Sequence, residues 1–373
     1  MKFTCDRTAL TDAVGIVQRA VASRSTLAVL EGILIKAKGG KVTLTGNDLE
    51  IGIEAVIGAE VSNEGKVVVN SALFGNIIRK MSGDTVTVDV AENHATELKC
   101  GNSNIRLNGI SGDEFPEIPG FDTELDLALS QKEFKDLIRH TIFAVGTSES
   151  KLILTGCLLE ASANNVSMVA VDGFRLALKK IVSEAESVSS GDAAIVIPAK
   201  TLREINSIIG DSDDKITIRC SQKNVRLEFD NVIFTSRLLE GDYIDYKKII
   251  PTEFKTRIKA DLKPLIEAVD RASVIITSEA TKSPLTVKIA DGVMQLRCET
   301  NAGKVDEVVP VEMRGDEIEI GFNNKYLLEA LKAAEGDEAY LEFIGPVNPC
   351  LITPVEGDSF KFIVLPVRLR SDS

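Results

Sequence analysis

The stretch Val67-Val68-Val69-Asn70, followed by an amphipathic pattern over Ser71–Met81, decides the fold because the chain contains three versions of it. The other two are Ile195-Val196-Ile197-Pro198 before Ala199–Ile209 and Ile318-Glu319-Ile320-Gly321-Phe322 before Asn323–Ala334. Each time, a strand pattern leads directly into apolar residues at helical spacing. Repetition of this kind predicts modules that pack side by side into an arc or a ring.

Each third of the chain also opens with an earlier helix pattern, at Arg7–Ala22, Lys132–Ala144 and Leu262–Ile276. Short alternating strands such as Lys41–Gly46 and Thr85–Val90 fill the rest of each third. We therefore expect an α+β fold of three modules, each with two helices packed on antiparallel sheet. The predicted modules are residues 1–121, 122–251 and 252–373.

Composition limits the class of protein. The 373 residues contain no run of about 20 apolar residues, and the N-terminus enters a strand pattern without an apolar leader, so we expect a cytoplasmic protein. Six cysteines are scattered without a C-x-x-C pair, which favours buried, reduced thiols. An even number also allows a secreted disulfide framework, which the expected location argues against.

Enzyme motifs are missing from the sequence. Gly40-Lys41, Gly65-Lys66 and Gly303-Lys304 are each followed by Val, so no P-loop is present, and neither G-x-G-x-x-G after a strand nor G-x-S-x-G occurs. The two histidines, His94 and His140, suit incidental structural roles and leave zinc without a ligand cluster. We therefore expect no catalytic residues, no metal and no cofactor.

The charge is unevenly distributed. The net charge of −13 opposes nucleic-acid binding, for which a basic surface is expected. Six windows that cover the predicted helices nevertheless carry a net +5 and the rest of the chain −18: Asp6–Val21, Ser71–Gly83, Gln131–His140, Ala199–Ile209, Lys259–Ala272 and Asn324–Ala334. Two interpretations remain open at this point: ordinary solvated helix faces, or a mildly positive surface on an acidic body.

Seven ordered motifs resemble the bacterial DNA polymerase III β subunit family, the sliding clamps, along the whole chain. They are Met1-Lys2-Phe3-Thr4, Leu44-Thr45-Gly46-Asn47-Asp48-Leu49-Glu50, Val171-Asp172-Gly173-Phe174-Arg175-Leu176-Ala177, Phe234-Thr235-Ser236-Arg237-Leu238, Gly241-Asp242-Tyr243-Ile244-Asp245-Tyr246, Ile320-Gly321-Phe322-Asn323 and Val364-Leu365-Pro366-Val367-Arg368-Leu369. None of these motifs carries catalytic chemistry.

The resemblance implies a homodimer whose two chains join head to tail into a closed ring around duplex DNA, with the helices inward. Weak, mobile phosphate contacts would then reconcile the acidic body with DNA. Arg24 matches the family's DNA-touching loop, and the other DNA-facing residues follow from helix placement only. The expected DNA-facing set is Arg24, Arg79, Lys80, Lys135, Arg139, Lys200, Arg203, Lys282 and Lys325.

The resemblance also implies a pocket between the second and third modules for short linear peptides of the replicative polymerase, the clamp loader and repair proteins. Apolar walls would take Leu and Phe anchors, while Arg175 and Asn323 would hold the peptide's polar groups. From the residues alone, Leu176 and Val364 would be interpreted as core. The matching positions are Leu154, Val171, Gly173, Phe174, Arg175, Leu176, Ile244, Lys248, Ile249, Asn323, Tyr326, Val347, Pro349, Ile363, Val364, Leu365, Pro366, Val367, Arg368 and Leu369.

Three positions depart from the family's pattern. Phe174 stands where a His is often found, Ile244 replaces a Pro, and Lys248 replaces an Arg and so loses a planar fork. The chain also continues beyond the family's usual Arg-Leu end with Arg370–Ser373, for which we expect frayed, polar structure.

For the ring joint, the resemblance implies apolar edges at Ile105 and Leu107 on the first module and at Val274 and Ile275 on the third. Two rival classes remain: a monomeric β-rich enzyme or ligand-binding protein with degenerate repeats, and a structural ring without DNA. The first needs a catalytic constellation, which the sequence does not contain.

Overall fold

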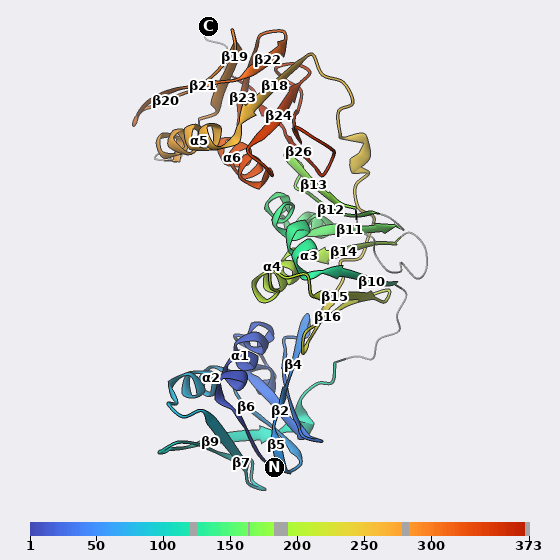
Figure 1. Cartoon of the computed structure of the whole chain (residues 1–373), viewed down its shortest axis with the longest axis vertical. Coiled ribbons are helices and arrows are strands. Elements are labelled where there is room, and N and C mark those ends of the chain that lie inside the picture. The colour runs from blue at the N-terminus through green and yellow to red at the C-terminus, as the bar shows by residue number, and fades with distance from the viewer. Residues whose placement is uncertain (119–124, 163–164, 183–192, 278–282, 370–373) are drawn as a thin grey trace. The chain divides into compact units, whose positions relative to one another are not determined.

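The computed structural model describes residues 1–118, 125–162, 165–182, 193–277 and 283–369. Its described residues fall into two compact units. The first comprises residues 1–132 and 204–238, and the second comprises residues 133–182, 193–203 and 239–369. Each unit is built on antiparallel sheets with helices on one face (Figure 1).

The first unit contains one sheet of 13 strands among its described residues. Every neighbouring pair in it is antiparallel. In sheet order, the strands are β10 (Leu125–Ser130), β15 (Lys215–Cys220), β16 (Asn224–Phe229), β17 (Val232–Arg237), β4 (Ile51–Gly58), β3 (Lys41–Asn47), β2 (Gly32–Lys38), β6 (Gly65–Asn70), β9 (Ser103–Ser111), β8 (Ala95–Cys100), β7 (Thr85–Val90), β1 (Lys2–Asp6) and β5 (Glu60–Asn63).

Two helices of the first unit, α1 (Arg7–Val17) and α2 (Ser71–Lys80), lie beside each other against this sheet (Figure 1). Each helix follows directly after a strand, and the last residue of that strand is the N-cap of the helix. Asp6 accepts the Ala9 N–H at 2.7 Å and Asn70 accepts the Leu73 N–H at 2.9 Å, so both side chains satisfy an otherwise unpaired donor of the first turn. In the first copy of the repeated strand-to-helix stretch, Asn70 therefore both ends the strand β6 and caps the helix α2.

The second unit contains a nine-stranded and a five-stranded sheet among its described residues. The nine strands are, in sheet order, β14 (Ala193–Pro198), β11 (Gly156–Ser162), β12 (Asn165–Val171), β13 (Arg175–Ile181), β26 (Phe360–Val364), β25 (Cys350–Pro354), β24 (Glu338–Phe343), β18 (Thr256–Asp261) and β22 (Glu312–Gly315). The five are β21 (Gly303–Pro310), β20 (Val293–Thr300), β19 (Leu285–Ala290), β23 (Ile318–Phe322) and β27 (Pro366–Val367).

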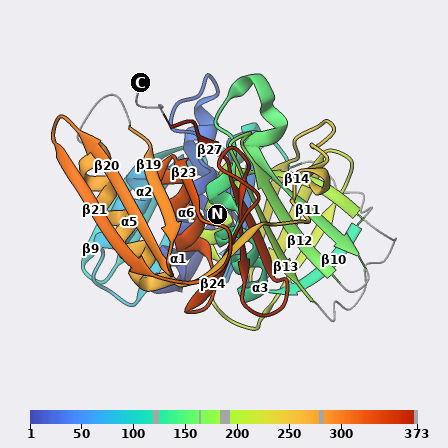
Figure 2. The same cartoon turned by 90° about the horizontal axis from the view of Figure 1, so that it is seen from above.

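Helices α5 (Leu262–Thr277) and α6 (Asn324–Ala333) pack together beside the five-stranded sheet (Figure 2). A side-chain contact joins them, because the Asn324 amide donates to the Ser273 hydroxyl at 2.8 Å. The remaining helices, α3 (Gln131–Arg139) and α4 (Ala199–Ile208), include residues of both units.

The six predicted helices are all present, and the α+β class is confirmed. The first helix of the first two thirds is shorter than predicted, since α1 continues only as the 3-10 turn Gln18–Ala20 and α3 is followed by the 3-10 turn Ile142–Ala144. All six cysteines are buried and free, as predicted. Burial raises the pKa of the Cys5 and Cys157 thiols to about 12. No helix in the described ranges is long and apolar enough to cross a membrane.

The two units do not coincide with the three predicted modules. The second predicted module contributes β10 and β15–β17 to the first unit and β11–β14 to the second. The reason is strand pairing: β17 pairs with β4 of the first module, and β13 pairs with β26 of the third. Sheets therefore continue across both predicted module boundaries.

Candidate functional site

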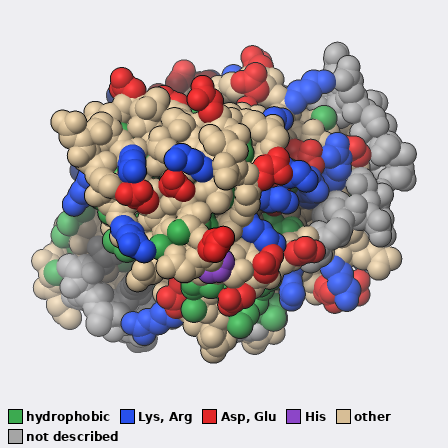
Figure 3. Space-filling model, turned by 90° about the horizontal axis from the view of Figure 1, so that it is seen from below, with side chains coloured by type: hydrophobic (Ala, Val, Ile, Leu, Met, Phe, Trp, Pro, Cys, Tyr) green, Lys and Arg blue, Asp and Glu red, His purple; other side chains and the backbone are tan. Residues whose placement is uncertain are grey.

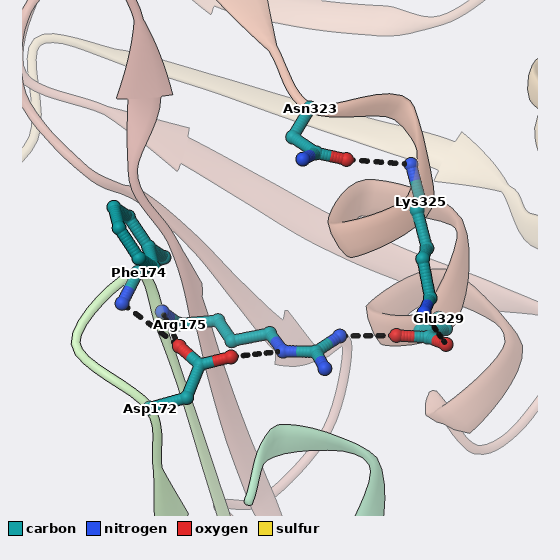
Figure 4. Close-up of polar contacts among 6 residues, drawn as sticks. All are labelled: Asp172, Phe174, Arg175, Asn323, Lys325 and Glu329. Carbon is teal, nitrogen blue, oxygen red and sulfur yellow. Dashed lines mark hydrogen bonds and ion pairs between the residues drawn. The ribbon is translucent and has the colours of Figure 1, made fainter. Parts of the chain in front are cut away.

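The turn between β12 and β13 presents one large apolar side chain to solvent. The Asp172 Oδ1 atom accepts the backbone N–H groups of Phe174 at 2.8 Å and Arg175 at 3.0 Å, which closes the turn. Gly173 takes a φ of +93°, a conformation that L side chains rarely adopt. As a result, Phe174 is 59% exposed at the start of β13 (Figure 4).

Arg175 lies beneath this turn, only 8% exposed. Its Nε donates to Asp172 Oδ2 at 2.9 Å, and its NH1 donates to Glu329 on α6 (Figure 4). The guanidinium carbon lies 4.4 Å from the ring centroid of Tyr326 and 5.6 Å from that of Phe143. Two carboxylates and two aromatic faces therefore compensate the cost of burying this charge.

The role predicted for Arg175 toward a peptide stays a prediction. Its Nε and NH1 donors are engaged by Asp172 and Glu329, and the low exposure of the side chain limits access to the remaining N–H donors. Arg175 joins the turn that carries Phe174 to helix α6. Asn323 is also engaged, since its side-chain oxygen accepts the Lys325 N–H at 3.1 Å and caps α6.

The C-terminal strands complete this region. Arg175 pairs with Val364 and Leu176 with Ile363 across β13 and β26, and the Leu365 N–H donates to the Phe174 carbonyl at 2.9 Å. Directly after Leu365, the strand β27 pairs with β23, and Val367 lies opposite Gly321. These pairings join residues nearly two hundred positions apart. We call the seam the β12–β13 turn, β26, β27 and the start of α6, together with the predicted pocket residues Ile244 and Val347.

Five predicted pocket residues are core in this structure. Each is at most 9% exposed: Leu154, Val171, Leu176, Ile363 and Val364. Three of them, Val171, Leu176 and Ile363, pack with Tyr246 in a single apolar cluster, and the partly buried Ile249 lies against it. This burial favours the core interpretation of Leu176 and Val364, and their place in a peptide pocket stays a prediction.

Four other predicted residues are large, apolar and exposed: Phe174 at 59%, Ile244 at 43%, Val347 at 73% and Val367 at 40%. Phe174 stacks on Tyr326, with ring centroids 6.2 Å apart and the planes at 24°. Lys248 is held by Asp245 at 2.8 Å but keeps 85% of its side chain exposed. The rest of the set is partly or fully exposed: Asn323, Pro349, Leu365, Pro366, Arg368 and Leu369.

A cavity of about 650 Å³ also opens in the second unit, but elsewhere. It is lined by β11, β12 and the Tyr246–Lys247 turn, together with Asp358 and Ser359, and contains none of the predicted pocket residues. No group of three or more His, Cys, Asp or Glu side chains in the described ranges is arranged to hold a metal ion.

A second charged cluster ties β13 to the residues after α6. Lys179, 4% exposed, donates to Glu335, which His140 Nε2 approaches at 3.3 Å and the Ser359 hydroxyl contacts at 3.2 Å. Burial alone would raise the pKa of Glu335, but the hydrogen bond and charge of Lys179, with His140 and Ser359, hold that pKa below its usual value. His140 thus has a structural role.

Comparison with known proteins gives the geometry a context. Models of the N-terminal, central and C-terminal domains of the DNA polymerase III beta subunit match residues 1–119, 128–245 and 247–368. The chain belongs to the DNA polymerase III beta subunit family, the bacterial sliding clamps. Sliding clamps are non-catalytic processivity factors of DNA replication, and this chain is one of them.

Relatives match over their full length. The chain is 34% identical to the beta sliding clamp of Bacillus subtilis and 32% identical to that of Halalkalibacterium halodurans, covering 99% of this chain and 100% of each relative. The crystal structure of the Bacillus subtilis clamp superposes with a TM-score of 0.95, at 32% identity and with 99% and 100% coverage. A Pseudomonas aeruginosa clamp bound to griselimycin has a TM-score of 0.93, at 25% identity and with the same coverage.

The residues predicted to face DNA in a sliding clamp are exposed with one exception. The exposed ones are Arg24, Arg79, Lys80, Arg139, Lys200, Arg203 and Lys325. Lys135 is 8% exposed, which leaves too little surface for a phosphate contact, so its prediction is contradicted. Lys282 lies outside the described residues. On the face drawn in Figure 3, basic and acidic side chains are interspersed over the described part.

The predicted joint residues of the clamp differ in exposure. Val274 is 69% exposed, and Ile105 and Ile275 are partly exposed. Leu107 is only 6% exposed, so it belongs to the core of its own unit, and its predicted place on the joint surface is contradicted. Ile105 and Leu107 lie on β9, whereas Val274 and Ile275 lie on helix α5, which packs against β21. In the described part of the chain both strands have a free edge, because Ser103–Asn108 pairs with β8 alone and β21 pairs with β20 alone.

The sequence analysis missed Asp172, Glu329 and Phe143. The Asp-Gly pair at 172–173 is a turn pattern that could have identified Asp172. Glu329 is separated from Arg175 by 154 positions and Phe143 lies in a 3-10 turn, so only the packing of β13, α6 and that turn reveals their roles.

Proposed function

We propose that two copies of this chain close head to tail into a ring around duplex DNA in the cytoplasm. The full-length match to sliding clamps supports this arrangement. The free edges of β9 and β21, with the exposed Val274 on the helix α5 that packs against β21, offer two strand edges that a partner copy would cover.

The seam would bind the short linear peptides of the replicative polymerase, the clamp loader and repair proteins. The observation that carries this proposal is the exposure of Phe174, Ile244, Val347 and Val367, because large apolar side chains in solvent mark interaction sites. Phe174 on its Tyr326 support would act as a rigid aromatic anchor, positioned from below by Arg175.

DNA would be held by enclosure more than by affinity. Only seven described residues of the predicted DNA-facing set are exposed. Of these, Arg79 already donates to Gln18 and Asn76, and Lys325 lies 3.9 Å from Glu329. Weak contacts of this kind screen phosphates and let the duplex slide. Because few phosphates are neutralised, direct DNA binding should depend only shallowly on salt.

Retention on circular and linearised duplex tests the ring. After loading by the clamp loader, the protein should stay on the nicked circle through gel filtration and leave the same DNA once a restriction enzyme has cut it. The Val274→Asp variant places a charge at the proposed joint, and we expect it to be monomeric by light scattering and not retained. Val182→Asp adds the same charge to an exposed valine outside the joint and the seam, and it should remain dimeric and retained. Equal retention on both DNA forms would contradict topological binding.

Ile244→Ala tests the seam. Removal of this exposed anchor should weaken binding of a fluorescent peptide from the polymerase's clamp-binding segment by about tenfold, since central apolar anchors are worth about 1–2 kcal/mol. Fluorescence anisotropy gives the dissociation constant. Phe254→Ala is the matched control, because Phe254 is also 43% exposed in the same unit but is not among the predicted pocket residues. An equal loss in both variants would argue against the seam.

A further inference from the structure

The first unit carries a cleft that has no part in the proposed ring or seam. It has a volume of about 680 Å³ and lies on the outward-facing side chains of β2, β3 and β4. The opposite side chains of these strands, such as Ile33, Ile35 and Leu44, are buried in the core. In Figure 1, α1 and α2 lie on the other side of β2 and β6 from the segment that follows β9.

That segment, residues 112–118, forms one wall of the cleft. Two glycines permit its close approach. A Cβ on Gly112 would lie 2.6 Å from the Lys66 side chain, and one on Gly52 would lie 2.9 Å from the end of Ile118. Phe115 packs on Val68 and Leu34 in an apolar cluster, which anchors the segment to the sheet. The wall is therefore a built part of the fold.

Lysines face one another across the strands of this cleft. Lys36 on β2 stands directly opposite Lys66 on β6, and Lys38 stands opposite Lys41 on β3. Like charges in directly opposed positions destabilise a sheet. Asp113 neutralises Lys66 at 2.6 Å. In the described part of the chain, Lys36, Lys38 and Lys41 have no ion pair, although the protein as a whole carries a net charge of −13.

The cleft is not purely basic. Its lining also includes the apolar side chains of Leu34, Val56 and Ile233, and the carboxylates of Glu54 and Glu117. A nucleic acid carries one charge per phosphate and would meet these carboxylates, and the one aromatic residue of the lining, Phe115, is 6% exposed and cannot stack on a base. A ligand with alternating acidic and apolar groups matches this lining better.

We propose that this cleft binds an extended partner peptide in which acidic and apolar residues alternate. The carboxylates of the peptide pair with Lys36, Lys38 and Lys41, and its apolar side chains lie over Val56 and Ile233. Since β2, β3 and β4 are each paired on both sides, the peptide is recognised through side chains and does not add a strand. The cleft presents lysines and the seam presents apolar side chains. The two surfaces would therefore bind different classes of partner peptide.

A fluorescein-labelled decapeptide of alternating Glu and Val is the probe, titrated against the full-length protein and followed by anisotropy. It should bind at least tenfold more tightly than decapeptides of alternating Glu and Ser or alternating Lys and Val. The triple variant Lys36→Gln/Lys38→Gln/Lys41→Gln should lose at least tenfold of this affinity. Bound peptide should also protect these three amines from acetylation in the wild type.

The matched control is Lys2→Gln/Lys99→Gln/Lys223→Gln, which removes the same charge from exposed lysines of the same unit outside the cleft. Its affinity should stay within twofold of wild type. The triple variant relieves like-charge contacts, so its melting temperature at low salt should not fall, and a loss of binding is then not a loss of fold. Wild-type affinity in the triple variant overturns the proposal. So does tighter binding of a ten-residue oligothymidylate, which would assign the cleft to nucleic acid.

Discussion

A chain that ends at Val364 should remain folded and dimeric and lose nearly all stimulation of the replicative polymerase. The missing residues, Leu365–Ser373, include β27 and the Leu365 N–H that holds the Phe174 carbonyl. They also include the exposed Val367. Val364 itself must stay, because it is fully buried and pairs with Arg175. We expect the loss to exceed about a hundredfold, since several contacts of the seam disappear together.

Primer extension on loaded circular DNA measures this effect, with light scattering to check the dimer. A chain that ends at Leu369 is the control. It lacks only Arg370–Ser373 and keeps every described residue of the seam, so its stimulation should equal that of the full chain. Full stimulation by the shorter chain would mean that partners bind elsewhere.

Arg175→Ala should destabilise the second unit by about 3 kcal/mol, the largest effect we expect from a single substitution at the seam. The change leaves the carboxylates of Asp172 and Glu329 facing a cavity without their cation, and removes the support beneath Tyr326. Asp172 is 11% exposed and Glu329 33%, so water screens only part of the cost. Urea unfolding followed by circular dichroism measures the free energy of unfolding.

Lys325→Ala is the matched control on the same helix. Lys325 also interacts with Glu329, at 3.9 Å, but 63% of its side chain is exposed, and exposed pairs contribute at most about 0.5 kcal/mol. Arg175→Met should be milder than Arg175→Ala, because it refills part of the space between Tyr326 and Phe143. If Arg175→Ala and Lys325→Ala cost the same, the buried ion pair is not the support that its geometry indicates.

Much of the fold could be predicted from local patterns. The helix after Asn70 was predicted from the strand pattern Val67–Asn70 that leads into apolar residues at helical spacing, and in the structure Asn70 caps this helix at 2.9 Å. Burial of all six cysteines followed from their scattered positions without a C-x-x-C pair. Such features depend on near neighbours in the chain, whose backbone hydrogen bonding and periodicity leave few alternatives.

The seam was less predictable. The resemblance named the residues of this region, but it could not tell buried from exposed side chains among them: Leu176 and Val364 are buried, whereas Phe174 and Val367 are exposed. In a strand, adjacent residues point to opposite faces, and only the pairing of β13 with β26 decides which face another element covers. Lys135 on helix α3 and Leu107 on β9 are also buried, because the packing of those elements, and not the local sequence, decides which side chains are covered.

The sequence by itself determined the family, the α+β class, the six helices and the absence of enzyme motifs, because these depend on periodicity, capping and ordered motifs along the chain. Only the tertiary structure decided that Arg175 is a buried support held by Asp172 and Glu329, and that four lysines of β2, β3 and β6 face one another in one cleft. The ion pairs of Arg175 join residues that lie far apart in the chain, and the register of strand pairing places the lysines opposite one another. Their energies depend on burial and on opposed charge, which exist only once the strands have paired.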